Sequence, residues 1–238
     1  MAGLLTQDSV ARYHREGYLR IDRVAGPNTI DALRRTYDAM LDGRIDCSAT
    51  DQPLGRLTRQ IMMPHHYADI FRTNEAIDTC RAVASALLGV DAPWFGFDML
   101  IYKPPGHAID TPWHQDFAYS AMPYAAAGSA IPYDSVVQFW IALDDVDADT
   151  GCMTFLPAMH RQPLLAHEVV AGEVDYSQRL LAIVDPDALP RDTAVACPLR
   201  AGGATVHSYG TPHYTGPNRS ADRPRRAYIL NFRRNDPA

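Results

Sequence analysis

The first part of the chain has apolar residues at the spacing of helices. Positions three and four apart lie on one face of a helix, so their repeat predicts an amphipathic helix. This spacing predicts three helices: one capped by Thr6 and ended by Gly17, one from residue 28 to residue 43, and one over residues 74–88. A short strand, Tyr18–Ile21, is predicted between the first two.

From about residue 93 onward, short apolar runs are separated by clusters of proline, glycine and aspartate. Five of these runs are strand candidates: residues 94–102, 136–146, 152–157, 202–209 and 226–232. Several short strands with turn signals between them favour a β-sandwich or a β-barrel. We therefore expect a mainly β fold with flanking helices, as one domain over residues 1–238. Residues 93–238 would form the barrel, and the mostly helical residues 1–92 would pack on it.

Composition and charge exclude several classes of protein. The chain has 238 residues, of which 47% are hydrophobic, and a net charge of -6. No apolar run approaches the roughly 18 residues that a membrane-spanning helix needs. The overall negative charge disfavours a nucleic-acid partner. The first residues lack a basic segment followed by an apolar one, so no secretory signal is expected and the predicted location is cytoplasmic.

The cysteines and the single lysine do not indicate a function. The four cysteines lie far apart in the sequence: Cys47, Cys80, Cys152 and Cys197. This scatter disfavours a disulfide framework or a cysteine zinc site. Lys103 is the only lysine among the 22 basic residues, which we attribute to codon usage.

Metal-binding residue types occur at two distant places in the chain. His114 and Asp116 are two residues apart, so in an extended segment their side chains point to the same face. His213 is a candidate third ligand, and His207 is the alternative to it. Two histidines and one carboxylate on one face leave coordination positions open, which is typical of non-haem iron(II) oxygenases. A solvent-exposed His–Asp pair is the competing interpretation of residues 114 and 116.

An arginine pair follows the distal histidine. Arg225 and Arg226 begin the strand candidate that ends the chain. Side chains alternate between the two faces of a strand, so only one of the two arginines points inward. The inward-pointing arginine can bind a carboxylate through two parallel hydrogen bonds. The sequence alone does not say which one that is.

Four segments in this order resemble the phytanoyl-CoA dioxygenase-like family of iron(II)- and 2-oxoglutarate-dependent oxygenases. They are IYKPPG (101–106), WHQD (113–116), FWIALDDVDADTGCMTFLPAMHR (139–161) and HYTGPNRSADRPRRA (213–227). The resemblance extends over most of the chain. It implies a double-stranded β-helix, a jelly-roll barrel of the cupin type.

The resemblance also implies roles for single residues. His114, Asp116 and His213 would be the iron ligands. Arg225 would pair with the distal carboxylate of 2-oxoglutarate, and Thr215 would assist it. Gln60 lies near a position where some members place a polar contact to the co-substrate. The cofactors implied are Fe(II), 2-oxoglutarate and O₂.

The resemblance implies an oxygenase that hydroxylates an unactivated C–H bond with release of succinate and CO₂. The loops 117–135 and 161–195 contain tyrosines and few basic residues, which favours a small or medium-sized metabolite, amino-acid-like or a natural-product intermediate. Candidate substrate contacts are Gln138, Trp140 and Phe117. A zinc-dependent hydrolase or isomerase on the same barrel, or a non-catalytic metabolite-binding protein, is the alternative. The sequence does not predict the oligomeric state.

Overall fold

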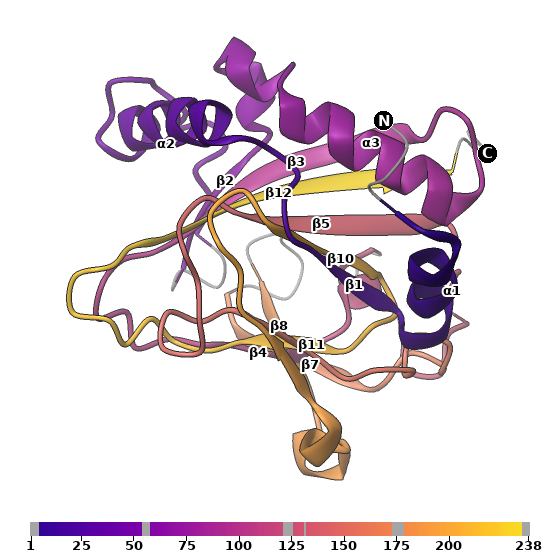
Figure 1. Ribbon diagram of the computed structural model, residues 1–238. Helices are drawn as coiled ribbons and strands as arrows, with labels where there is room; N and C mark the ends of the chain where they lie inside the picture. The colour runs from indigo at the N-terminus through magenta and orange to yellow at the C-terminus, as the bar shows by residue number, and fades with distance from the viewer. Residues whose placement is uncertain (1–4, 54–57, 121–125, 131, 173–178, 235–238) are drawn as a thin grey trace.

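Two facing β-sheets and a separate two-stranded ribbon make up most of the fold (Figure 1). The computed structural model describes residues 5–53, 58–120, 126–130, 132–172 and 179–234. The larger sheet has the strand order β1-β10-β5-β12-β3-β2, the smaller sheet β4-β11-β6-β9, and the ribbon pairs β7 with β8.

The strands of the larger sheet are β1 (Tyr18–Ile21), β2 (Arg59–Met62), β3 (Trp94–Lys103), β5 (Val136–Ala142), β10 (Ala204–Ser208) and β12 (Arg225–Arg233). Those of the smaller sheet are β4 (Thr111–His114), β6 (Met153–Phe155), β9 (Val195–Cys197) and β11 (His213–Thr215). The ribbon consists of β7 (His167–Ala171) and β8 (Leu180–Ile183). All pairings are antiparallel.

Three α-helices lie against the larger sheet: α1 (Gln7–Glu16), α2 (Pro27–Leu41) and α3 (Glu75–Leu88). Figure 1 shows α2 and α3 above this sheet, on the side away from the smaller sheet. In the described part of the chain, five short 3-10 helices connect the elements: η1 (Pro64–His66), η2 (Asp69–Phe71), η3 (Asp116–Tyr119), η4 (Pro186–Ala188) and η5 (Arg191–Thr193). None of the described helices is long and apolar enough to cross a membrane.

The helix ends follow the capping signals in the sequence. The Thr6 side chain accepts a hydrogen bond from the Ser9 amide, and Asn74 caps α3 in the same way. Gly17 ends α1 at a positive φ of 84°. A β-carbon there would lie 2.5 Å from the buried His160 ring, so this position needs glycine for two reasons.

Two apolar cores lie on opposite faces of the larger sheet. The outer core joins helix residues such as Leu33 and Tyr37 to the strand residues Leu100 and Phe139. The inner core, between the two sheets, contains Trp140, Ala227, Ile229 and Phe155, among others. This arrangement confirms the expected fold class, a jelly-roll barrel with N-terminal helices packed on it.

The strand register explains which side chains point inward. Arg225 pairs with Lys103, and Ile229 pairs with Trp140. Cross-strand partners lie on the same face of a sheet. The face with Trp140 and Ile229 therefore also carries Arg225 and Lys103. Strands β1 and β2 come from the predominantly helical residues 1–92 but add to the two edges of this sheet.

Candidate active site

Two strands of the smaller sheet bring the candidate metal ligands together. His114 ends β4, His213 begins β11, and the two residues are paired in register. Asp116 lies two residues after His114. One ligand atom from each of the three side chains lies within 4.8 Å of the others. Asp116 Oδ1 is 3.6 Å from the Nε2 atom of each histidine.

The local backbone around Asp116 differs from the expectation. Strand β4 ends at His114, Gln115 is extended, and Asp116 is the first residue of η3. The carboxylate still faces the two imidazoles, because the extended Gln115 turns residues 114 and 116 toward the same side. The expected extended segment is thus present at Gln115, although the strand itself ends at His114, and the two side chains lie together.

Backbone carbonyls orient both histidines. His114 Nδ1 lies 2.7 Å from the Pro112 carbonyl, and His213 Nδ1 lies 2.9 Å from the Thr211 carbonyl. A carbonyl oxygen only accepts, so each Nδ1 carries the proton and donates it. Each Nε2 therefore has a free lone pair directed toward Asp116. This is the tautomer that a metal-binding histidine needs.

The second oxygen of Asp116 has its own partners. His207 Nε2 and Gln138 Nε2 both donate to Oδ2, each at 2.8 Å. His207, the alternative to His213 as a ligand, thus holds the carboxylate rather than joining the ligand cluster. Gln138, which was expected to contact a substrate, also hydrogen-bonds this carboxylate. Oδ1 is left for a metal ion.

Burial and neighbouring charges set the protonation states of the cluster. Burial, reinforced by His114, holds the pKa of His213 well below its usual value. Burial alone would raise the pKa of Asp116, but His213, His114 and His207 outweigh it and hold that pKa well below the usual range. A neutral His213 imidazole beside an ionised Asp116 carboxylate suits a donor set for iron(II).

Gln115, between the two ligands of the motif, joins this segment to the ribbon. It is fully buried, and its side chain donates to the Gly210 carbonyl and accepts from the Leu165 amide. The backbone N–H of Gln115 donates to His167 Nε2 at 3.1 Å, and His167 Nδ1 donates to the Leu165 carbonyl. The start of β7 is therefore hydrogen-bonded to the metal-binding segment.

A second polar cluster lies at the start of β12. Arg225 is 1% exposed, and its Nη2 donates to Thr215 Oγ1 at 3.3 Å. Within the described residues its Nε and Nη1 have no hydrogen-bond partner. The guanidinium lies over the Trp140 ring, 5.4 Å from its centre. Burial lowers the pKa of Arg225 to about 10, which still leaves it charged at neutral pH.

Arg226 points to the opposite face. It donates to the carboxylates of Asp144 and Asp38 on the outer side of the sheet. The alternation of β12 thus answers the question that the sequence left open: Arg225 is the inward arginine.

Lys103 belongs to the inner cluster, and sequence reasoning missed it. Its Nζ atom lies 3.2 Å from Thr215 Oγ1, 2.9 Å from the Gly216 carbonyl and 3.5 Å from the Thr215 carbonyl. Its status as the only lysine was the signal available, and attributing it to codon usage overlooked this position.

The remaining predicted contacts lie at the margins of this site. Gln60 on β2 pairs with Ile101, is buried on the inner face, and directs its amide to Met62 Sδ at 3.1 Å. Phe117 in η3 packs against the cluster of Ala118 and its apolar neighbours. Of the two segments expected to be loops, 117–135 and 161–195, residues 121–125, 131 and 173–178 lie outside the described residues. The second segment is not a simple loop, because it contains β7, β8, η4 and η5.

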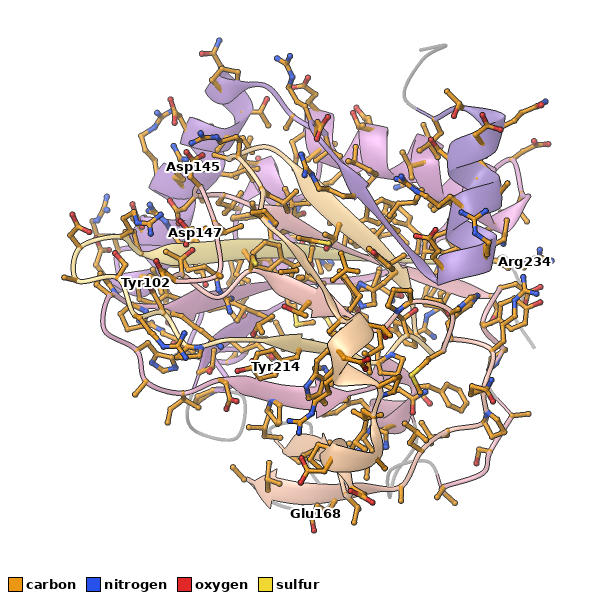
Figure 2. All side chains as sticks on the ribbon, turned by 60° about the horizontal axis from the view of Figure 1, so that its bottom comes forward. Tyr102, Asp145, Asp147, Glu168, Tyr214 and Arg234 are labelled. Atoms are coloured by element: carbon orange, nitrogen blue, oxygen red, sulfur yellow. The ribbon has the colours of Figure 1, made fainter. Side chains whose placement is uncertain are left out.

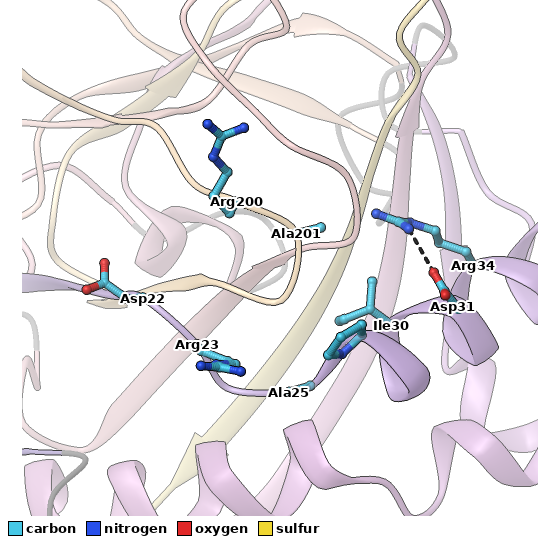
Figure 3. Close-up of a pocket in the computed structure, with 9 residues that line it drawn as sticks. Asp22, Arg23, Ala25, Ile30, Asp31, Arg34, Arg200 and Ala201 are labelled. Atoms are coloured by element: carbon cyan, nitrogen blue, oxygen red, sulfur yellow. Dashed lines mark hydrogen bonds and ion pairs between the residues drawn. The ribbon is translucent and has the colours of Figure 1, made fainter.

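Two surface cavities are separate from the triad. One, of about 280 Å³, lies between the segment after β1, helix α2 and the segment before β10, and Figure 3 shows its Arg34–Asp31 ion pair. The other, of about 490 Å³, includes Trp113 and Tyr214 on the outer face of the smaller sheet, where Figure 2 labels Tyr214. Neither cavity is lined by a triad residue.

Comparison with known proteins identifies the family. A family model described as Phytanoyl-CoA dioxygenase (PhyH) matches residues 13–227. Peroxisomal phytanoyl-CoA dioxygenase of Bos taurus is 37% identical over 73 residues, which are 29% of this chain and 19% of that protein. The chain therefore matches only about a fifth of the length of this curated relative.

Solved structures extend the likeness to the whole chain. EvdO2 from Micromonospora carbonacea var. aurantiaca, complexed with 2-oxoglutarate, is 29% identical with a TM-score of 0.76, covering 100% of this chain and 96% of that one. SnoK, a non-heme alpha ketoglutarate dependent carbocyclase from nogalamycin biosynthesis, shares the fold at 22% identity and a TM-score of 0.70, covering 98% and 85%. With the family model covering most of its length, the chain belongs to the phytanoyl-CoA dioxygenase family.

Proposed function

We propose that this protein is an iron(II)- and 2-oxoglutarate-dependent oxygenase that oxidises an unactivated C–H bond and releases succinate and CO₂. One observation carries the proposal: the inner face of the barrel holds both a two-histidine, one-carboxylate cluster and a buried arginine with unsatisfied N–H groups. A metal site alone fits many reactions. The arginine adds a receptor for the far end of a dicarboxylate.

Each residue of the site has a task in this proposal. His114, Asp116 and His213 would hold iron(II), which, when bound, supplies oxygen activation coupled to decarboxylation of 2-oxoglutarate. Arg225 and Thr215 would bind the distal carboxylate and so orient the co-substrate. The Trp140 ring beneath Arg225 excludes water and strengthens that charge pair.

Hydroxylation is the default outcome that we propose, and the substrate is a small or medium-sized metabolite. The carbocyclase SnoK shows that this fold also supports ring closure. Amino-acid-like compounds and natural-product intermediates are the proposed class, because the described parts of segments 117–135 and 161–195 combine aromatic residues with few cations. A cytoplasmic location stays a prediction.

The first experiment needs no substrate. We expect the metal-free protein, given iron(II) and 2-oxoglutarate without oxygen, to develop a weak charge-transfer band in the visible spectrum. Asp116→Ala should abolish the band, and Arg225→Ala should weaken it at limiting 2-oxoglutarate. Arg226→Ala is the matched control, because its side chain lies on the opposite face.

Two results would contradict the proposal. One is the absence of the band in the wild-type protein. The other is a purified protein that retains zinc and turns over a substrate without 2-oxoglutarate. The second result would favour a zinc-dependent hydrolase or isomerase. Ligand binding without any metal dependence would favour a metabolite-binding protein.

A further inference from the structure

Two buried basic side chains, Lys103 and Arg225, lie side by side where β3 ends and β12 begins. Lys103 is 0% exposed and Arg225 is 1% exposed, and the two residues are direct partners in the strand register. Neither forms an ion pair with a carboxylate of the described residues. Like charges that are buried together repel each other, so this end of the barrel is prepared for an anion.

The hydroxyl of Thr215 connects the two basic side chains. Its oxygen lies 3.2 Å from Lys103 Nζ and 3.3 Å from Arg225 Nη2. A hydroxyl has two acceptor lone pairs and one proton to donate. The guanidinium only donates, and an ammonium group only donates. When both cations are charged, the two lone pairs are occupied and the proton of Thr215 is available for a third partner.

We propose that Lys103 is a positioning residue for the co-substrate, which fixes the Thr215 hydroxyl as a donor to the distal carboxylate of 2-oxoglutarate and adds a second positive charge beside Arg225. This inference rests on the proposed function, because it assigns a task within the same co-substrate site. It does not involve the metal ligands.

The protonation state of Lys103 decides which partner donates in the hydrogen bond between Lys103 Nζ and Thr215 Oγ1. Burial, and then the charge of Arg225, lower the pKa of Lys103 to about 6, while Asp110 acts in the opposite direction. A neutral amine donates to the Gly216 and Thr215 carbonyls and accepts the proton of the Thr215 hydroxyl. A carboxylate bound beside Lys103 favours the ammonium form. Binding of 2-oxoglutarate near pH 7.5 should therefore take up a proton.

The surroundings of Lys103 contain few other ionisable groups. Among the described residues, Arg225 faces it from β12 and Asp110 acts on it from the segment between β3 and β4. His107, in that same segment, has a pKa lowered by burial and by the charges of Lys103 and Arg225. Thr215 and Gly216, on and after β11, contribute only neutral oxygens.

The first test compares two co-substrates in the Lys103→Met variant. Binding of 2-oxoglutarate and of 2-oxovalerate, which lacks the distal carboxylate, is measured on the iron(II) protein without oxygen. We expect the variant to bind 2-oxoglutarate about 10- to 100-fold more weakly, the usual effect of a lost charged hydrogen bond. Its affinity for 2-oxovalerate should be unchanged. An equal loss for both compounds would mean a merely structural role and would overturn the proposal.

The second test measures the proton directly. Calorimetric titrations of 2-oxoglutarate in two buffers of different ionisation enthalpy give the number of protons bound. We expect an uptake approaching one proton near pH 7.5 for the wild-type protein, and none for Lys103→Met or with 2-oxovalerate. Equal uptake in wild type and variant would place the proton elsewhere and would also overturn the role of Lys103.

Controls separate this inference from the proposed function. Lys103→Gln keeps polar donors without the charge, so it replaces Lys103→Met if the latter does not fold, as judged by its circular dichroism spectrum. Arg225→Met should weaken binding of 2-oxoglutarate whether or not Lys103 matters. If Arg225→Met weakens that binding and both Lys103 variants do not, the role of Lys103 fails alone. If the wild-type protein binds no 2-oxoglutarate, both fail.

Discussion

The two oxygens of the Asp116 carboxylate have different environments. His207 and Gln138 hold Oδ2, so Oδ1 alone faces the histidine nitrogens. A carboxylate held in this way binds a metal ion through one oxygen rather than two. An octahedral ion with three such protein ligands keeps three positions open. This is enough for a chelating 2-oxo acid and one further ligand.

We expect His207→Phe to weaken metal binding without removing a ligand. Gln138 alone would then hold Oδ2, so the carboxylate would be less firmly oriented. Loss of such an outer partner typically costs 10- to 100-fold in metal affinity. Titration with Co(II), followed by its visible absorption, measures the effect. His160→Phe is a matched control, because this buried histidine contacts none of the ligands; equal affinity in His207→Phe and wild type would contradict the role.

The sequence indicated the ligands but not the residues that support them. His114 and Asp116 lie in one short motif, and the family resemblance pointed to His213. The partners of Oδ2 come from β5 and β10, whose positions depend on the register of the larger sheet. No local pattern encodes that register. For Lys103 the sequence offered only its status as the single lysine, and its pairing with Arg225 shows where it lies.

At the scale of elements, His167 is one of the residues that hydrogen-bond the ribbon β7–β8 to the metal-binding segment. The Gln115 amide donates to His167, and His167 donates to the Leu165 carbonyl. Burial lowers the pKa of His167 to about 4, so the ring stays neutral and Nε2 remains an acceptor at neutral pH. The position of the ribbon and that of the ligands are thereby linked.

His167→Phe should loosen this link. The backbone N–H of Gln115 would lose its acceptor while remaining buried. This loss costs about 1–3 kcal/mol in the free energy of unfolding. Urea denaturation measures this loss. Hydrogen exchange gives the local effect, with faster exchange expected at the Gln115 amide. Unchanged exchange there would show that the ribbon does not stabilise the segment.

Elements with strong local signals were predicted, and those defined by pairing were not. The three helices begin and end near their capping residues, and β3, β5 and β12 match long apolar runs. Strands β2, β7, β8, β9 and β11 have three to five residues each and were not predicted. Short strands gain their stability from neighbours that are distant in sequence, so their own residues carry little signal.

For the molecule as a whole, buried neutral histidines make stability depend on pH. Burial lowers the pKa values of His160 and His167 to about 4, from 6.5, and that of His213 well below 6.5. Between pH 6.5 and about pH 4 the unfolded chain therefore binds more protons than the folded chain. Stability therefore falls as the pH is lowered from about 6.5 to about 4. Asp98 acts in the opposite direction, because burial raises its pKa.

Urea denaturation of the metal-free protein at pH 7, 6 and 5 tests this dependence. Each histidine contributes at most about 1.4 kcal/mol per pH unit to the slope. We expect His160→Phe to have a shallower slope than the wild type, whatever its stability at pH 7. A stability that stays constant from pH 7 to pH 5 would contradict the expected protonation states.

The central position of β12 has a consequence for biosynthesis. This strand lies between β3 and β5, yet the ribosome makes it long after both of them. Until it emerges, the nascent chain presents two unpaired strand edges, and such edges invite pairing with other chains. Arg225, at the start of β12, is placed only when that gap is filled. The strand that completes the barrel thus also places the arginine that we propose as the anion receptor, so a nascent chain does not acquire this residue's site before its strand edges are paired.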